Sequence, residues 1–164
     1  MLDGHFEQLA VQDLPIPNLI MSSSFRFLED IALADIAFEA TGDSIQALFQ
    51  GATQALLEIM ADPLTVGAAW NHRCIKTEAF LEDLLVEWLS EIVYWKDAAG
   101  VVFSDAPLTL LKASDGWTLE AVLIGAPVDA ATQALRNDVK GITRHLYKIW
   151  QDGPVWKARV VVDV

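Results

Sequence analysis

The chain has 164 residues, of which 53% are hydrophobic and 21% are charged, so it can form one domain with a sizeable core and wholesale disorder is excluded. Its 23 acidic and 11 basic side chains give a net charge of −12, which argues against stable direct binding of nucleic acid and favours a cation or a basic protein surface as partner. The single cysteine excludes an internal disulfide and a four-cysteine zinc site.

Residues 1–24 lack sustained hydrophobic periodicity and contain two prolines followed by three serines. We expect them to form an N-terminal extension (a mobile arm, an added leader or a strand docked on a partner) and residues 25–164 to form the domain. The extension lacks the basic and apolar regions of a secretory signal, and no stretch reaches the ~20 apolar residues that span a bilayer. These features predict a soluble, cytoplasmic protein that makes no membrane contact.

The first part of the domain is predicted to contain two strands and a helix. Apolar runs over Phe25–Leu28 and Ala34–Ala40 predict the strands, and the second run alternates with a period of two. The helix is expected to begin with Asp43 as N-cap and Gln46 completing a capping box, and to end at Asp62-Pro63.

The rest of the domain is predicted to contain one more helix and several strands, which together indicate an α+β fold: a mostly antiparallel sheet with two helices packed on one face. A strand over Arg73–Glu78 leads into an amphipathic helix over Phe80–Lys96, which Gly100 ends. Val139–Trp150 is ambiguous, because its apolar spacing fits a helix and its β-branched residues fit a strand. The other predicted features are strands over Val101–Asp105, Leu108–Ala113, Trp117–Ile124 and Trp156–Val164, a hairpin turn at Asp115-Gly116, and a loop or short helix over Pro127–Asn137.

Charge is unevenly distributed along the chain. Residues 1–135 carry 5 basic and 20 acidic side chains, whereas residues 136–164 carry 6 basic and 3 acidic ones. The C-terminal segment is therefore where a phosphate-rich partner would meet favourable charge, although an ordinary solvated face has the same composition. The second helix has an acidic face, either solvated or docked on a basic partner, with Glu82, Asp83, Glu87 and Glu91.

Familiar catalytic signatures are missing, since the chain has no Walker loop, no GxGxxG, no HExxH and no GxSxG. A nucleophilic pair of Cys74 and His145 has no local support in the sequence, and a buried, inert thiol explains Cys74 more simply. We therefore predict no catalytic residues.

Carboxylates on apolar strands are the more informative feature. Asp35 lies in one predicted strand, and Asp163 lies in another, beside the main-chain carboxylate of Val164. Such oxygens repel one another unless a cation or a basic side chain compensates them, and an all-oxygen set suits calcium or magnesium. Alternatively, both aspartates are ordinary solvent-facing residues that pair with Lys157 or Arg159. Two further carboxylates could join either arrangement, namely Glu39 and Asp30.

Four stretches carry motifs of a known family in the expected order. The first is Phe27-Leu28-Glu29 with Ala34–Phe38, like FLEHTADVGI, and the second is Gly42–Met60, like the family's first helix. The third is Glu82–Leu89 with Gly100–Ser104, like EDLLVDWLNELLY…GLVFS. The fourth is Val139–His145 with Ala158–Val164, like VKAVTYH and ARVILDV. Over roughly Phe25–Val164 the chain resembles archease, a small accessory protein of the tRNA-splicing RNA ligase.

The resemblance implies a sheet with two helices and a divalent cation, often calcium, that is held by Asp35, Asp163 and Val164. It implies a non-enzymatic activator that helps the ligase form its guanylate intermediate with GTP and metal. Lys140 and His145 are candidate accessory residues. In place of the family's histidine and threonine before the first aspartate this chain has Ala32-Leu33, which suggests a divergent bacterial branch.

Two other functions stay open. The acidic composition also fits a chaperone-like adaptor, or interaction module, for another basic client protein. A metal-dependent phosphohydrolase is the third hypothesis, because two strand carboxylates can hold magnesium and activate water, although no adjacent base or phosphate cradle is visible in the sequence.

Overall fold

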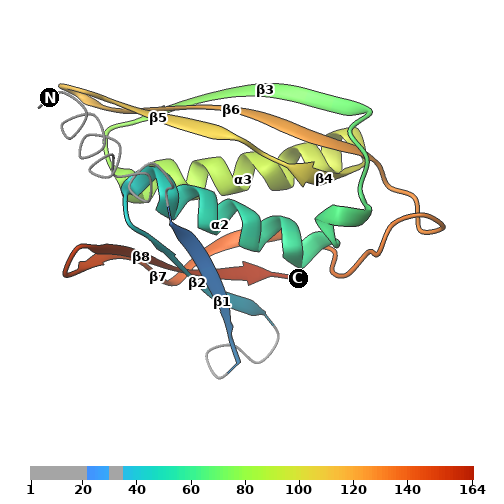
Figure 1. Cartoon of the computed structure of the whole chain (residues 1–164), viewed down its shortest axis with the longest axis horizontal. Helices are drawn as coiled ribbons and strands as arrows, with labels where there is room; N and C mark the ends of the chain where they lie inside the picture. The colour runs from blue at the N-terminus through green and yellow to red at the C-terminus, as the bar shows by residue number, and fades with distance from the viewer. Residues whose placement is uncertain (1–21, 30–34) are drawn as a thin grey trace, which may run out of the picture.

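The computed structural model describes residues 22–29 and 35–164. It contains two antiparallel four-stranded sheets with two helices between them (Figure 1). Most of the predicted N-terminal extension and Asp30 lie outside the described residues. Within the described part of the chain, no helix is both long and apolar enough to cross a membrane.

The first sheet combines the two ends of the domain. Its strand order is β1-β2-β8-β7, and every neighbouring pair is antiparallel. The strands are β1 (Ser23–Leu28), β2 (Ile36–Gly42), β8 (Val155–Asp163) and β7 (Gly141–Asp152).

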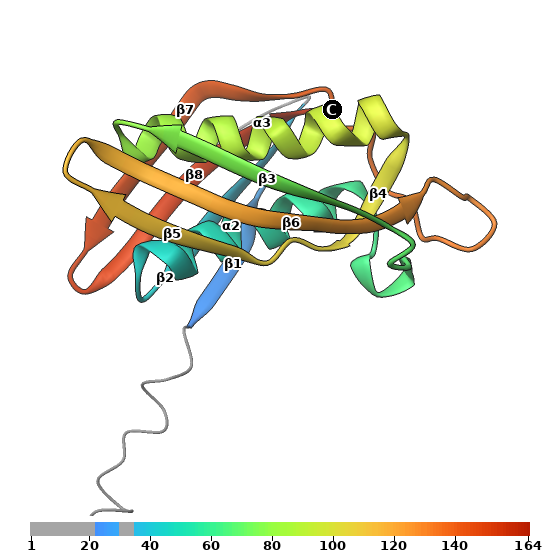
Figure 2. The same ribbon diagram turned by 90° about the horizontal axis from the view of Figure 1, so that it is seen from above.

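The second sheet is built from the middle of the chain around one long strand. That strand, β6, pairs with β3 along one edge, while β4 and β5 pair with successive parts of it. In Figure 2 this sheet lies over both helices, and its strands cross the direction of the first sheet. The strands are β3 (Trp70–Glu78), β4 (Val101–Asp105), β5 (Leu108–Ala113) and β6 (Gly116–Pro127).

The helix between β2 and β3 is α2 (Ile45–Met60), and a 3-10 turn, η2 (Pro63–Thr65), follows it. Its N-cap is Ser44, whose side chain accepts a hydrogen bond from the Ala47 N–H at 3.1 Å, so the prediction of Asp43 as N-cap is wrong. Asp43 instead accepts a hydrogen bond from the Ser22 N–H at 3.0 Å and fixes the start of β1.

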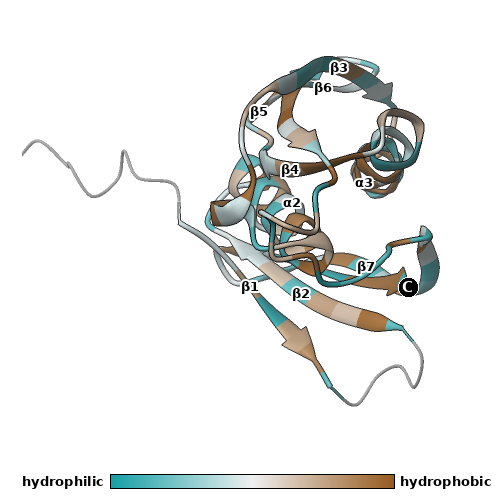
Figure 3. Ribbon diagram, turned by 90° about the vertical axis from the view of Figure 1, so that its right-hand side faces the viewer, coloured by the Kyte–Doolittle hydropathy of each residue, from teal (hydrophilic) through white to brown (hydrophobic). Residues whose placement is uncertain are grey.

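The second helix is α3 (Leu81–Ala99), and it ends as predicted at Gly100, whose φ of 63° is left-handed. Trp88 of α3 is fully buried and donates an indole hydrogen bond to the Thr53 hydroxyl of α2 at 2.9 Å. This contact joins the two helices, and the end-on view in Figure 3 shows both of them between the two sheets.

The predicted α+β class and antiparallel pairing are confirmed, but the strands form two sheets where one was expected. The reason lies in α2, of whose 16 residues 11 are buried. A helix that is apolar around most of its circumference needs cover on more than one side. Each sheet accordingly has helices on its inner face, and none of the described helices covers either outer face (Figure 1).

The ambiguous segment Val139–Trp150 is a strand, β7, with an interruption. Its register against β8 shifts between Thr143 and Lys148, and within this bulge Leu146 has a φ of 56°. A bulge of this kind disrupts the alternation of side chains along a strand. This explains why the apolar residues of the segment fitted neither strand alternation nor helical spacing cleanly.

Candidate functional site

The predicted carboxylates meet at one end of the first sheet. The ladder of β2 and β8 ends with the pair of Ile36 and Val162, and Asp35 and Asp163 are the next residues beyond that pair on the two segments. Asp35 lies at a bend just before β2, whereas Asp163 ends β8. Lys140, the residue before β7, donates its backbone N–H to the Asp163 carbonyl at 2.8 Å.

These carboxylates belong to the outer face of the sheet. Val160 and Val162, which alternate with Asp163 along β8, are fully buried against the helices. Asp35 is half-buried, Asp163 is exposed, and the Val164 side chain packs against the core. Among the described residues, neither aspartate side chain has a hydrogen-bond or ion-pair partner.

The space beside Asp163 is open. Gly141 pairs with Asp163 on β7, and a Cβ added to this glycine would have no neighbour within 4 Å. A partner group can therefore approach the carboxylates from the outer face.

The oxygen donors at this end comprise two carboxylates and the main-chain oxygens of Val164. Within residues 22–29 and 35–164, no group of three or more His, Cys, Asp or Glu side chains is arranged to hold a metal ion. The donor chemistry nevertheless fits a hard divalent cation, because every donor is an oxygen and no described basic group neutralises the pair.

Two predicted accessory residues lie away from this end. Glu39 is four positions from Asp35 along β2, about 13 Å at the rise of an antiparallel strand. Its carboxylate pairs with Arg26 at 3.4 Å and with Lys157 at 3.9 Å. His145 is exposed in the β7 bulge. The structure thus brings together Asp35, Asp163, Val164 and Lys140, but neither Glu39 nor His145.

A buried lysine fixes the segment that carries Lys140. Lys96, on the last turn of α3, donates to the Asp138 carboxylate at 2.5 Å and to the Val139 carbonyl at 2.7 Å, and it pairs with Asp97 at 2.9 Å. Burial alone would lower the pKa of Lys96, but the hydrogen bonds from its ammonium to Asp138 and Asp97 raise it overall. Sequence reasoning missed this role, although a lysine ending an otherwise acidic helix was a visible signal.

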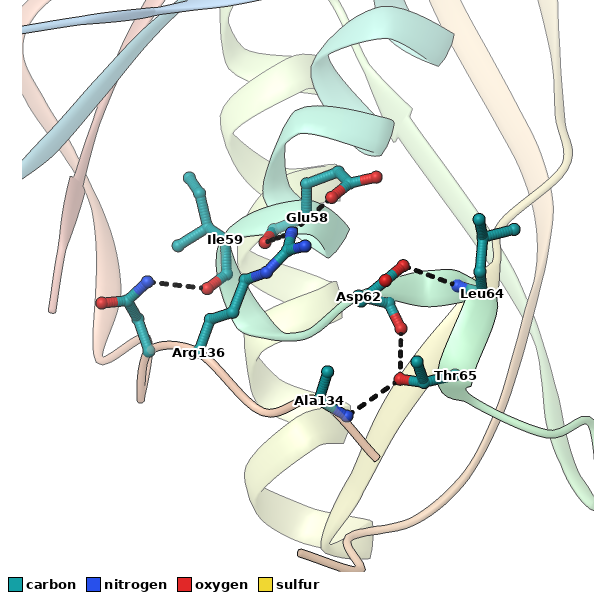
Figure 4. A network of polar contacts seen from close by, with 8 residues as sticks. Glu58, Ile59, Asp62, Leu64, Thr65, Ala134 and Arg136 are labelled. Atoms are coloured by element: carbon teal, nitrogen blue, oxygen red, sulfur yellow. Dashed lines mark hydrogen bonds and ion pairs between the residues drawn. The ribbon is translucent and has the colours of Figure 1, made fainter. Parts of the chain in front are cut away.

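The loop before this segment is held on the end of α2, as Figure 4 shows. The Asn137 side chain donates to the Ile59 carbonyl at 2.9 Å, and the Ala134 N–H donates to the Thr65 hydroxyl at 3.0 Å. The first of these bonds occupies a backbone carbonyl that the end of α2 leaves without an intrahelical partner. A cavity of about 420 Å³ lies beside the loop, with Lys96 and Asp138 among its lining residues.

Cys74 and His145 do not form a nucleophilic pair. Cys74 is buried on the inner face of β3, in the second sheet, whereas His145 belongs to the first sheet. Burial raises the pKa of the Cys74 thiol to about 11, which keeps it protonated and unreactive at neutral pH.

Comparison with known proteins gives the same family at every level. The family described as "Archease protein family (MTH1598/TM1083)" matches residues 25–164. The chain belongs to the archease family. Archease of Methanosarcina mazei is 28% identical over 141 residues, covering 85% of this chain and 95% of the relative. Archease of Methanopyrus kandleri is 31% identical over 134 residues, covering 80% and 94%.

Solved structures share the archease fold. The solution structure of Protein 1598 of Methanobacterium thermoautotrophicum matches with a TM-score of 0.75 and 29% identity, covering 86% of this chain and 99% of the other. A Thermotoga maritima archease, described as a "possible chaperone", matches with a TM-score of 0.55 and 22% identity, covering 85% and 98%. At that identity the second likeness concerns the fold alone.

Proposed function

We propose that this chain is a non-enzymatic activator of a GTP- and metal-dependent RNA ligase of tRNA splicing in the cytoplasm. In this proposal it presents a divalent cation held by Asp35, Asp163 and the main-chain oxygens of Val164. The supporting observation is the register of β2 and β8, whose last pair lies one residue from both Asp35 and Asp163, and neither aspartate has a described basic partner. Family membership is the further support for this proposal.

The division of roles follows from the chemistry of the donors. A bound cation supplies concentrated positive charge that can order phosphate oxygens at the ligase. Calcium suits this set better than magnesium, because it accepts irregular oxygen geometry. Asp35 and Asp163 bind and orient the cation from the end of the sheet, while the backbone N–H of Lys140 anchors the main chain of Asp163. The open space at Gly141 leaves room for the ligase surface.

The test is guanylylation and turnover of the ligase with and without this protein. Stimulation is expected from the wild-type protein and from Glu87→Gln, a matched control on the exposed face of α3. Stimulation should fall at least tenfold with Asp35→Asn and with Asp163→Asn, since both keep the side-chain shape and remove the charge. No stimulation by the wild-type protein, or equal stimulation by all variants, would overturn the proposal.

A second candidate is a chaperone-like adaptor for another basic client, and the exposed start of α3 favours it. Glu82 and Glu87 are exposed there, whereas Glu91 is engaged with Lys76 at 2.8 Å. Loss of client binding in a Glu82→Gln/Glu87→Gln double variant, with binding retained in Asp163→Asn, would favour the adaptor over the ligase activator.

A further inference from the structure

On the outer face of the first sheet, residues from four different strands form two rows of side chains. The hydrogen-bond register aligns positions across all four strands, with alternating positions on the outer face. The rows are Arg26, Glu39, Arg159 and Lys148, and next to them Ser24, Thr41, Lys157 and Trp150.

These rows hold four cations and one carboxylate, in a chain whose net charge is −12. Glu39 is shared by Arg26 and Lys157, so it cannot neutralise both. Lys157 also pairs with Asp152, at the end of the hairpin, at 3.5 Å. With Asp152 included, four cations meet two carboxylates, so these rows have excess positive charge, and 68% of the Arg26 side chain is exposed.

The remaining cations are held in place without a described carboxylate partner. Arg159 donates its Nε hydrogen to the Leu146 carbonyl of the β7 bulge at 2.8 Å, so the bulge orients the guanidinium. The Lys148 ammonium lies 5.2 Å from the centre of the Trp150 ring. A cation and an indole thus lie side by side on the outer face of the sheet.

We propose that this face binds single-stranded nucleic acid, with phosphates along the cationic row and a base stacked on Trp150. A strand bound without sequence preference needs a basic track and an aromatic platform, and a flat sheet provides both at once. The cationic row spans about 14 Å across the four strands, the reach of a few nucleotides.

The position of the rows adds to this inference. They lie on the same sheet face as Asp35 and Asp163, about 13 Å along the strands. A strand on the rows would therefore place its end near the carboxylate pair. The inference stands on the charge and register of this face alone and does not depend on the ligase.

The second sheet provides a control for the effect of the cationic rows on binding. Its outer face carries one cation–carboxylate pair, Arg73 with Glu120 at 3.8 Å, beside exposed Ile75 and Leu111. Arg73 has 69% of its side chain exposed, which matches Arg26, but it lies in neutral surroundings. Arg73→Ala is therefore the control for Arg26→Ala.

Affinity should be modest and should depend strongly on salt, because the rest of the chain is acidic. Three to four phosphate contacts give a logarithmic salt slope of roughly −2 to −3 for a single strand, which is roughly a 15- to 60-fold loss between 50 and 200 mM salt.

The experiment measures fluorescence anisotropy of a labelled RNA dodecamer at 50 mM salt, without metal and without ligase, with the full chain. We expect saturable binding that the Arg26→Ala/Lys148→Ala double variant weakens at least tenfold and Arg73→Ala leaves within twofold. Trp150→Ala should weaken binding of the RNA roughly fivefold or more. The same substitution should weaken binding of an abasic strand much less, because that strand has no base to stack on the indole. Unchanged melting curves of the variants exclude misfolding.

A DNA dodecamer of the same sequence and an RNA duplex complete the test. Equal binding of RNA and DNA supports recognition of the shared phosphates and bases, and preference for RNA supports recognition that includes the 2′-hydroxyl. Absence of binding by the wild-type chain overturns the inference, and so does equal weakening by Arg73→Ala. Duplex binding as tight as single-strand binding overturns the assignment to single strands. None of these failures affects the proposed cation site.

Discussion

The two sheets cover the same pair of helices with similar apolar inner faces, yet their outer faces differ in chemistry. The first sheet has paired carboxylates at one end and cationic rows beyond them, whereas the second has a single ion pair among threonines and exposed aliphatic side chains. Inner faces are constrained by packing, so a difference restricted to the outer faces points to function. We therefore assign function to the first sheet and a mainly structural role to the second.

The largest expected effect concerns the helix layer that both sheets share. Trp88→Ala should cost about 3–5 kcal/mol of unfolding free energy, because it empties the centre of the core and leaves the Thr53 hydroxyl without its indole donor. Urea unfolding followed by circular dichroism measures it. Tyr94→Ala, at an exposed position of α3, should cost much less. A loss restricted to one sheet, detected by amide exchange, would contradict a shared core.

A glycine in each sheet gives the next comparison. A Cβ at Gly125 of β6 would collide with the Val102 carbonyl, whereas a Cβ at Gly141 of β7 would enter open space. Gly125→Ala should therefore cost about 1–3 kcal/mol, and Gly141→Ala should change stability by less than about 0.5 kcal/mol. Thermal unfolding of both variants measures this. Equal losses would contradict the open outer face beside Asp163.

The smallest expected effect separates the ion pairs that join each sheet to α3. Lys76 of the second sheet pairs with Glu91 of α3, and both side chains are mostly buried. Arg144 of the first sheet pairs with Asp83 of α3, and both side chains are largely exposed. Lys76→Met should cost about 1 kcal/mol and Arg144→Met less than about 0.5 kcal/mol. Urea unfolding at pH 7 measures both.

The pH dependence of the Lys76 pair sharpens that comparison. Burial tends to raise the pKa of Glu91, but hydrogen bonds from Lys76 and Trp95 outweigh it, so the pKa is lowered from 4.5. The stabilisation is therefore complete above about pH 4.5 and is lost as pH falls through the lower folded value. Wild type and Lys76→Met should converge in stability as the pH falls well below 4.5. A difference that persists there would contradict the assigned charge pairing.

Local patterns in the sequence predicted most elements, because alternation and helical spacing are properties of single segments. The end of α3 at Gly100 and the strands around Asp115-Gly116 are examples. The division into two sheets was not predictable, since it depends on which distant strands pair. The cap at Ser44 was missed because Asp43, one residue earlier, is an equally good capping residue and has another partner in the fold.

The candidate site was predictable only in part. Asp35 and Asp163 were visible as carboxylates in apolar segments, and the antiparallel pairing of β2 and β8 ends one residue from each of them. The cationic rows were not visible, because Arg26 and Lys148 are far apart in sequence and a bulge in β7 sets the phase of Lys148 and Trp150.

The most direct test of the central claim is a calorimetric titration of calcium, and separately of magnesium, into four forms of the protein. The account predicts that wild type and Glu87→Gln bind one ion with equal affinity, and that Asp35→Asn and Asp163→Asn each weaken binding at least tenfold. A wild-type protein that binds neither ion, or aspartate variants that bind as tightly as wild type, would contradict it.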